Sequence, residues 1–217
     1  VAERIFSPSL QQTTPEKKTF LKKELETFHP GCIVIGSSTG GPPALEKVLA
    51  GLSKPLRIPI VIAQHMPPVF TASLANRLQD STGVQAAEAK DGEELLPNRI
   101  YVAPGNYHLS IVKRGTSNFL KLDQSAQRNS VRPAVDVLFE SAAQVFGHKL
   151  CGIVLTGMGE DGMMGSVAIK EKGGGVMIQD QLSSVVFGMP GAVFNAGAYD
   201  FKGNLTDLNQ FIKRFVA

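Results

Sequence analysis

The sequence predicts an α/β fold: a doubly wound, mostly parallel sheet with helices on both faces and an added antiparallel hairpin. Two observations lead to this prediction. Short apolar runs alternate along the chain with stretches of helical periodicity, which is typical of right-handed βαβ units. The runs are apolar throughout and do not alternate with polar residues, as expected of strands that are buried on both faces.

The composition indicates one folded domain with a polar tail. Of the 217 residues, 43% are hydrophobic and 19% are charged, which is the balance of a globular protein. A chain of this length can bury a core in a single domain. We expect residues 1–30 to be a linker or tail with a short helix from Pro15 to Phe28, and residues 31–217 to form the domain.

The charge and cysteine patterns exclude several classes of function. The 22 basic and 19 acidic residues are mixed along the chain, and no tryptophan is present, so nucleic acid is not an expected partner. Cys32 and Cys151 lack the spacing of a metal site or a disulfide framework, so we expect reduced core residues and no metal or other cofactor. No apolar run approaches the ~18 residues of a membrane span, and no signal peptide is evident; we expect a cytoplasmic protein.

Four pairs of strand and helix account for the predicted parallel sheet. The strands are the apolar runs at residues 32–36, 58–64, 150–157 and 174–180. The helices that follow them are expected at residues 42–51, 69–79, 162–172 and 188–197.

The middle of the chain has a different pattern. Residues 99–122 alternate in polarity and contain turns centred on Gly105 and Gly115, so we expect an antiparallel hairpin or meander there. A helix is expected from Pro133 to Phe146, with a buried stripe of Val135, Leu138, Phe139, Ala142 and Val145.

The segment IGSSTGGPP after the first predicted strand predicts a turn that presents a polar side chain. Gly36 and Gly41 have the spacing of a Walker A loop, but Pro42 and Pro43 stand where that motif needs Lys and Ser or Thr. Each proline also removes a backbone N–H that an anion site would use, which disfavours phosphate binding. A serine in this turn would face outward like the nucleophile of a strand-to-helix elbow, although G-x-S-x-G is absent. An ordinary helix-capping turn is the alternative.

One of the four histidines directly follows a predicted parallel strand. Ligands of open parallel sheets bind outside the carboxyl ends of the strands. His29 and His148 precede strands and are expected at the opposite edge, and His108 is expected to be half-buried or solvated in the hairpin. His65 follows the second strand, so it is the candidate general base for a serine at the neighbouring strand end.

Three carboxylates at strand ends are candidates to orient His65: Glu160, Asp161 and Asp180. Physical reasoning does not choose among them. The glycines of the TGMGEDG loop suggest a tight turn close to a ligand, which favours Glu160 and Asp161. Asp161 taken alone fits an ordinary helix N-cap equally well.

Several longer motifs strengthen the pattern: IGSSTGG, AQHMPP, VAPGNYHL, RPAVDVLFESAA, VLTGMGEDGMMG and QDQLSSVVFGMPGAV. In this order and at these spacings they resemble the catalytic domain of CheB-type chemotaxis protein-glutamate methylesterases, over about residues 31–200. The resemblance implies an α/β fold with a Ser-His-Asp triad. It also implies removal of methyl esters from glutamate side chains of methyl-accepting chemotaxis receptors, with glutamine deamidation as a second activity.

Matched position by position, the resemblance implies roles for five residues. Ser38 corresponds to the nucleophile, His65 to the base and Asp161 to the acid, while Thr39 and the backbone amide of Met158 lie around the oxyanion. The implied partner is the cytoplasmic helical domain of the receptors.

The family usually carries an N-terminal receiver domain, whereas about thirty residues precede the first strand here. The expectation is therefore either an isolated catalytic domain or a relative without a receiver. A non-catalytic module that grips a receptor helix or an anion in the same cleft is the alternative function.

Overall fold

The computed structural model describes residues 27–52 and 55–215. Its strands are β1 (Cys32–Ser37), β2 (Ile60–Gln64), β3 (Gln85–Glu88), β4 (Arg99–Val102), β5 (His108–Arg114), β6 (Ser117–Asp123), β7 (Leu150–Val154), β8 (Gly175–Gln179) and β9 (Phe201–Gly203). Its helices are α2 (Gly41–Val48), α3 (Pro68–Thr82), α4 (Val135–Phe146), α5 (Met163–Glu171), α6 (Met189–Ala196) and α7 (Leu205–Lys213), with a short 3-10 turn at Gly147–Lys149.

Seven parallel strands form the main sheet in the order β3-β4-β2-β1-β7-β8-β9. β1 lies between β2 and β7, and the register pairs Ser37 with Gln64 and Gly36 with Val154. The chain runs outward from β1 to β2 and later returns to β7 on the other side of β1. This topological switch point is where open parallel sheets place their ligand sites.

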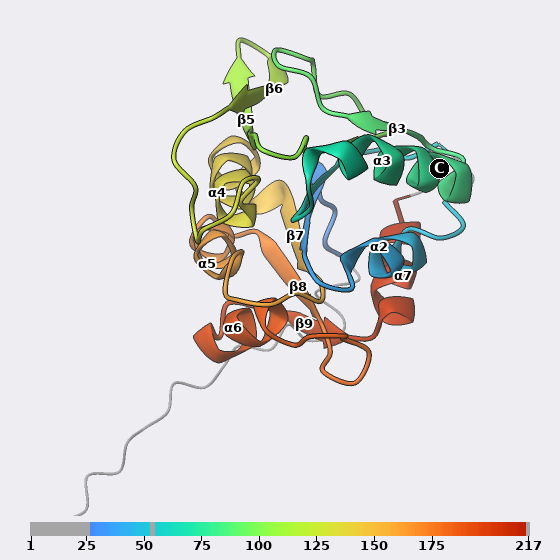
Figure 1. Cartoon of the computed structure of the whole chain (residues 1–217), viewed down its shortest axis with the longest axis vertical. Coiled ribbons are helices and arrows are strands. Elements are labelled where there is room, and N and C mark those ends of the chain that lie inside the picture. Colours follow the sequence, from blue (N-terminus) through green and yellow to red (C-terminus); the bar gives the residue numbers. More distant parts are fainter. Residues whose placement is uncertain (1–26, 53–54, 216–217) are drawn as a thin grey trace, which may run out of the picture.

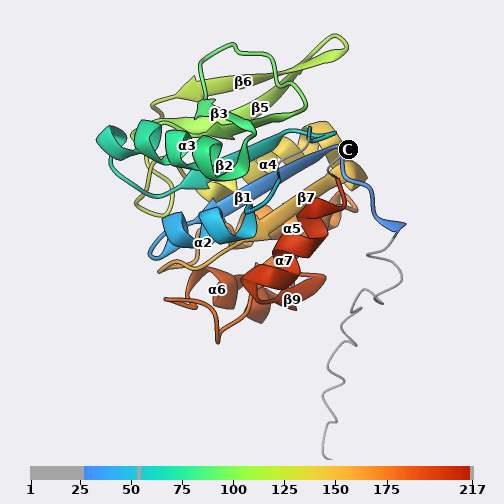
Figure 2. The ribbon, with the colours of Figure 1, turned by 90° about the vertical axis from the view of Figure 1, so that its right-hand side faces the viewer.

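Helices cover both faces of the sheet, as predicted. One core layer contains α2, α3 and α7, and the other contains α4, α5 and α6 (Figures 1 and 2). Alternate residues of β1 serve the two layers: Ile33 and Ile35 pack on the first side and Val34 on the second. Burying an aliphatic side chain of this kind contributes about 1.5–3 kcal/mol, so the central strand is held from both faces.

The prediction of an antiparallel hairpin is confirmed for the second part of residues 99–122. β5 and β6 pair in antiparallel fashion around a two-residue turn at Gly115 and Thr116, and β5 packs against α4. For residues 99–102 the prediction was wrong, because β4 is a parallel strand between β3 and β2. Tyr101 counted as a polar residue in the apparent alternation, but its side chain is buried. Its hydroxyl donates to the Glu94 carbonyl and accepts from the Leu96 N–H.

The expectation for His108 was also wrong, because this side chain is buried. Its Nε2 donates to the Ala126 carbonyl at 3.0 Å, and its Nδ1 accepts from the Ala134 N–H at 3.2 Å. The ring is thus satisfied on both sides and fastens the loop that precedes α4.

Other expectations have mixed outcomes. Cys32 and Cys151 are buried free thiols, as predicted, and burial raises the pKa of both. The sequence did not predict β3, β9 or α7. Of the expected helix from Pro15 to Phe28, residues 15–26 lie outside the described residues. Within the described ranges, no helix is long and apolar enough to cross a bilayer.

Candidate active site

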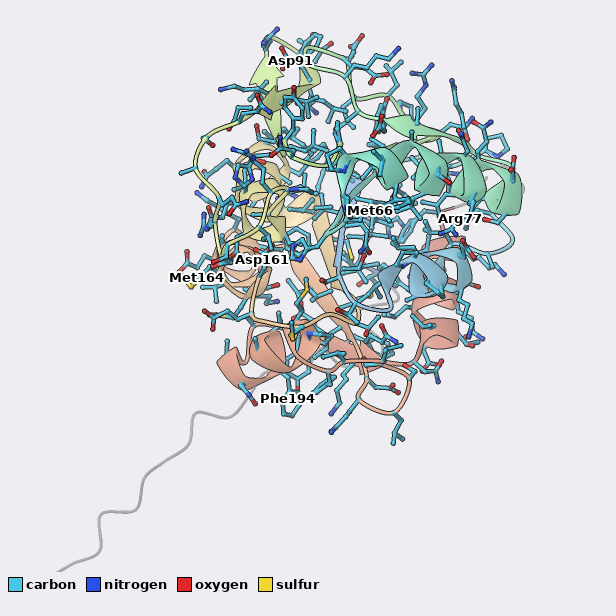
Figure 3. All side chains as sticks on the ribbon, in the orientation of Figure 1. Met66, Arg77, Asp91, Asp161, Met164 and Phe194 are labelled. Atoms are coloured by element: carbon cyan, nitrogen blue, oxygen red, sulfur yellow. The ribbon has the colours of Figure 1, made fainter. Side chains whose placement is uncertain are left out.

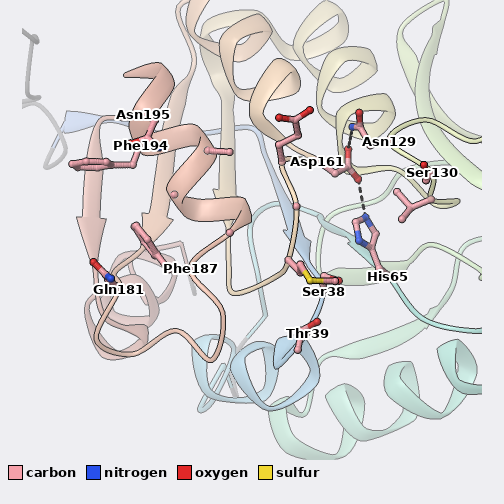
Figure 4. A pocket seen from close by; sticks show the side chains of 17 residues that line it. Ser38, Thr39, His65, Asn129, Ser130, Asp161, Gln181, Phe187, Phe194 and Asn195 are labelled. Carbon is pink, nitrogen blue, oxygen red and sulfur yellow. Dashed lines mark hydrogen bonds and ion pairs between the residues drawn. The ribbon is translucent and has the colours of Figure 1, made fainter.

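Ser38 and His65 are the first residues beyond two adjacent strands. The β1–β2 register ends at Ser37 and Gln64, and the His65 N–H donates to the Ser37 carbonyl at 3.0 Å. Both Ser38 and His65 line a cleft of about 1100 Å³ at the carboxyl edge of the sheet (Figure 4). The parallel pairing therefore brings together two polar side chains that are 27 positions apart in sequence.

The two serines of the turn have different surroundings. Ser37 is fully buried, and its Oγ donates to Gln64 Oε1 at 2.6 Å. Ser38 is half-buried, its N–H donates to the Thr156 carbonyl at 3.0 Å, and its carbonyl accepts from Gln64 Nε2 at 3.0 Å. In the described part of the chain the Ser38 hydroxyl has no hydrogen-bond partner. The Ser38 backbone is thus held by hydrogen bonds, whereas its hydroxyl is not held by any of the described residues.

Glycines allow the close approach of the loops around Ser38. A Cβ on Gly157 would lie 2.3 Å from Met189 Sδ and 2.8 Å from Ser38 Cβ, so the loop after β7 can pass Ser38 only with glycine there. A Cβ on Gly41 would lie 1.9 Å from Gln64 Oε1, at the start of α2. The glycine-rich segment of the sequence therefore serves tight packing against the turn that holds Ser38.

His65 contacts one of the three candidate carboxylates. Its Nε2 lies 2.7 Å from Asp161 Oδ2, which leaves Nδ1 as the second ring nitrogen (Figure 4). Asp180 instead accepts hydrogen bonds from the N–H and Oγ of Ser183, and Glu160 is an exposed residue of the cleft. The choice that the residue pattern left open is thus resolved geometrically toward Asp161.

The Asp161 carboxylate is saturated by donors. Oδ2 accepts from the Val135 N–H at 2.6 Å as well as from His65, and Oδ1 accepts from the N–H groups of Asp136 and Gly162 at 3.0 and 3.1 Å. Burial favours a raised pKa, but the hydrogen bonds from His65 and from the first turn of α4 outweigh it, so the pKa of Asp161 is lowered. Asp161 therefore carries its negative charge in a largely buried position.

Asp136 is a second buried carboxylate that the sequence analysis missed. Its Oδ1 accepts from the N–H groups of Gly162 and Gly165, at 3.0 and 2.7 Å, at the start of α5. Burial raises the pKa of Asp136, and the nearby charge of Asp161 acts in the same direction. The two aspartates thus cap each other's helix: Asp161 caps α4, and Asp136 caps α5. Figure 3 marks Asp161 just before α5, whose second residue, Met164, is also labelled.

Asn129 joins the two carboxylates. Its Nδ2 donates to Asp136 Oδ2 at 2.8 Å and to Asp161 Oδ1 at 2.9 Å. It lies in the irregular segment between β6 and α4 and lines the cleft (Figure 4). Asp136 could have been noticed in the sequence as an acidic residue in the first turn of the predicted helix, where a capping role is common. No sequence pattern marks Asn129.

The remaining predicted site residues lie at the rim of the cleft. Thr39 is exposed, and so is the side chain of Met158. Within the described residues the Met158 N–H has no hydrogen-bond acceptor. Beyond Ser38, the cleft continues between Phe187, Phe194 and Asn195. Among residues 27–52 and 55–215, no group of three or more His, Cys, Asp or Glu side chains is arranged to hold a metal ion.

A free hydroxyl, an imidazole and a buried carboxylate in one cleft are the groups that nucleophilic acyl transfer requires. The fold and this cleft define the class of α/β proteins with a hydrolase-type site at a sheet edge. The chain belongs to the CheB methylesterase family, whose model matches residues 33–212.

Similar proteins agree with this assignment. The chain is 44% identical over 200 residues to the protein-glutamate methylesterase/protein-glutamine glutaminase of Trichodesmium erythraeum, covering 92% of this chain and 56% of that protein. It is 49% identical over 166 residues to protein-glutamate methylesterase/protein-glutamine glutaminase 2 of Caulobacter vibrioides, covering 76% of this chain and 48% of that protein. The chain thus spans about half the length of the curated relatives it matches.

A solved structure is similar over nearly its whole length. The crystal structure of the Thermotoga maritima CheB methylesterase catalytic domain matches with a TM-score of 0.81 and 40% sequence identity. The match covers 86% of this chain and 99% of that one. The predicted fold class and family resemblance are therefore confirmed.

Proposed function

We propose that this chain is a serine hydrolase domain that removes methyl esters from glutamate side chains of methyl-accepting chemotaxis receptors. Its relatives in Trichodesmium erythraeum and Caulobacter vibrioides are named protein-glutamate methylesterase/protein-glutamine glutaminase, which supports this substrate class. The observation that carries the proposal is the hydrogen bond at 2.7 Å between Asp161 Oδ2 and the His65 ring, beside a serine whose hydroxyl is unpaired among the described residues.

In the proposed reaction, Ser38 Oγ attacks the carbonyl carbon of the glutamyl methyl ester. Because Nε2 of His65 faces Asp161, Nδ1 is the nitrogen that accepts the Ser38 proton. Asp161 fixes the orientation of the ring and offsets the positive charge that the imidazolium gains. A positioned base of this kind typically contributes a factor of about 10² to 10⁴ in rate.

The tetrahedral intermediate carries its negative charge on the former carbonyl oxygen. The Met158 N–H and the Thr39 position are the candidate donors to this oxygen, and one such donor is worth about 2.7–4 kcal/mol. His65 then returns the proton to the departing methoxide, which leaves as methanol. Water attacks the glutamyl-enzyme with the same assistance from His65, which releases the receptor with a glutamate side-chain carboxylate and restores the Ser38 hydroxyl.

The same steps convert receptor glutamine to glutamate, with ammonia as the leaving group. Ammonia leaves less readily than methanol, so we expect deamidation to be the slower reaction. Comparing ammonia release from a glutamine-containing receptor with methanol release from its methylated form measures this difference.

The partner in this proposal is the cytoplasmic helical domain of the receptors, and the site of action is the cytoplasm at membrane-bound receptor arrays. An N-terminal receiver domain is a proposed regulatory partner, because the curated relatives are about twice as long as the stretch that matches.

The decisive experiment is methanol release from methylated receptor membranes by the wild type and by Ser38→Ala, side by side. We expect release by the wild type and none above background by the variant. Stoichiometric modification of Ser38 by a serine-directed phosphonylating reagent provides a second measurement. Equal methanol release by both proteins would overturn the assignment, and absence of both release and labelling would favour a non-catalytic binding module.

A further inference from the structure

We propose that Asn129 is a positioning residue for this site: its side-chain amide ties Asp161 to Asp136 and thereby keeps Asp161 Oδ2 directed at His65 Nε2. The inference rests on the proposed function in that His65 is the base. The geometry on which it depends is independent of the natural substrate.

The two oxygens of Asp161 divide their partners. Oδ1 accepts from Asn129 Nδ2 at 2.9 Å and from two backbone N–H groups, while Oδ2 accepts from His65 Nε2 at 2.7 Å and from the Val135 N–H at 2.6 Å. The Asn129 amide is the one side-chain donor to Oδ1 within the described residues. Together with the backbone donors, it limits the rotation of the carboxylate about its last bond and leaves Oδ2 for His65.

The same nitrogen separates two buried like charges. Asn129 Nδ2 also donates to Asp136 Oδ2 at 2.8 Å, so one amide group neutralises part of the repulsion between Asp136 and Asp161. The titratable group that faces Asp161 is His65, and the charged group that faces Asp136 is Arg128, whose Nε lies 3.8 Å from Asp136 Oδ2. The charge of Arg128 is shared with Glu140, to which both of its terminal nitrogens donate at 2.6 Å.

The backbone around Asn129 is unusual in a way that supports a functional role. Asn129 and Ser130 have φ values of 53° and 62°, two successive left-handed residues that are not glycine. Such conformations persist only where the surroundings enforce them, and they concentrate at functional sites. Here Arg128 is held by Glu140, and Arg132 donates to the carbonyl oxygens of Gln124 and Ser125, so the segment is anchored on both sides of Asn129.

Removal of the Asn129 side chain should have different effects if the residue positions Asp161 than if it only stabilises the fold. Without the Asn129 amide, Asp161 keeps three backbone donors, so the fold and the cap of α4 persist. The Asp161 carboxylate then loses one neutralising donor and attracts a proton on His65 more strongly. The acid limb of the pH–rate profile should therefore move to higher pH, a shift that general destabilisation does not cause.

The test compares Asn129→Gly with a matched control, Asn98→Gly. Asn98 is also left-handed, with φ 58°, and its Oδ1 accepts one hydrogen bond, from the Leu56 N–H, but it does not line the cleft. Glycine adopts this backbone without strain, so both variants lose one asparagine side chain at the same backbone cost. The substrate is p-nitrophenyl acetate, a simple ester that does not require the receptor.

Two readouts are measured on each protein. The first is kcat and KM as a function of pH. The second is the low-field proton resonance of the His65 Nε2–H, identified by its loss in His65→Gln. For Asn129→Gly we expect kcat to fall roughly 10- to 100-fold, as for loss of a hydrogen bond to a charged group, with KM little changed. We also expect the acid limb to move to higher pH and the resonance to broaden, whereas Asn98→Gly should match the wild type in each respect.

The proposal is overturned if the two glycine variants have the same kcat and the same acid limb, or if kcat falls while the limb and the resonance stay unchanged. If Asn129→Gly does not fold, Asn129→Asp replaces it, since it preserves the size of the side chain. At neutral pH its carboxylate repels Asp161, and on acidification its protonated form donates again, so its deficit relative to the wild type should shrink as the pH falls. If the wild type hydrolyses neither p-nitrophenyl acetate nor the methylated receptor, the proposed function fails, while the resonance still tests Asn129.

Discussion

Gln64 and Ser38 are joined by a hydrogen bond in which Gln64 Nε2 donates to the Ser38 carbonyl oxygen at 3.0 Å. The same nitrogen donates to the His65 carbonyl at 2.9 Å, and Gln64 Oε1 accepts from Ser37 Oγ at 2.6 Å. One buried side chain at the end of β2 therefore fixes the backbone of both residues that present reactive groups to the cleft.

Replacing Gln64 by glutamate should damage both stability and activity. A carboxylate cannot donate to either carbonyl, so the His65 carbonyl loses its Gln64 donor and the Ser38 carbonyl keeps only the Gly41 N–H. A buried polar group left unpaired costs about 1–3 kcal/mol. Urea unfolding and p-nitrophenyl acetate hydrolysis measure the two effects. Gln144→Glu is the matched control, because Gln144 is an exposed residue of α4. Equal unfolding free energies for the two variants would contradict this prediction.

The two serines of the turn should respond in opposite ways to alanine substitution. Ser38→Ala should abolish hydrolysis and leave stability nearly unchanged, because its hydroxyl has no partner in the described part of the chain. Ser37→Ala should lower the free energy of unfolding by about 1–3 kcal/mol, because Gln64 Oε1 loses its buried donor, and should retain Ser38 labelling. Methanol release and thermal unfolding of both variants provide the comparison, and loss of labelling only in Ser37→Ala would reverse the assignment.

Asp161→Asn should lower kcat by about 10²- to 10⁴-fold, because an amide cannot offset the imidazolium charge as a carboxylate does. Asp180→Asn is the control, since Asp180 closes a turn with Ser183 and does not contact His65. The ratio of kcat values on p-nitrophenyl acetate decides the point. A comparable loss in both variants would mean that the carboxylate on His65 has no special part in the reaction.

The stability of the protein in acid should depend on Asp161. Its folded-state pKa is lowered, so it stabilises the fold above the unfolded value of about 3.9, and this contribution is lost as the pH falls through the folded value. Asp136 has a raised pKa and acts with the opposite sign, weakening the fold as the pH rises above about 3.9. Urea unfolding between roughly pH 2 and pH 4 should therefore show a smaller loss of stability in Asp161→Asn than in the wild type. Parallel curves would argue against this linkage.

The sequence predicted the central strands because burial on both faces of the sheet requires apolar residues at successive positions. β1, β2, β7 and β8 are fully buried, and each is apolar along its length except for the polar last residue of β1, β2 and β8. β3 contains alternating exposed and buried residues, and β9 has only three residues, so the sequence of neither strand can be distinguished from that of the neighbouring loops. Their pairing depends on neighbouring strands that are distant in sequence, which no local pattern contains.

The site was predictable to the extent that it follows from strand ends. Ser38 and His65 follow adjacent parallel strands, and the carboxyl ends of parallel strands lie at one edge of a sheet. This rule needs only the predicted positions of the strands. The contact of Asp161 with His65 depends on the conformation of the loop after β7, and physical reasoning alone left Glu160 equally open. Asn129 acts from an irregular segment 32 positions before Asp161, so only the three-dimensional arrangement reveals it.

Asp161 caps the amino end of α4, the helix that contains Asp136. Asp136 in turn caps the amino end of α5, the helix that follows Asp161. In many enzymes the charged groups of the active site lower the stability of the fold, and their removal raises stability while activity is lost. Here the carboxylate that faces His65 also satisfies the N–H groups of Val135 and Asp136, which are buried. Under the proposed function, selection for a stable domain and selection for catalysis therefore act on one side chain. Variants of this chain selected only for heat resistance are expected to keep Asp161, even when no selection for catalysis is applied.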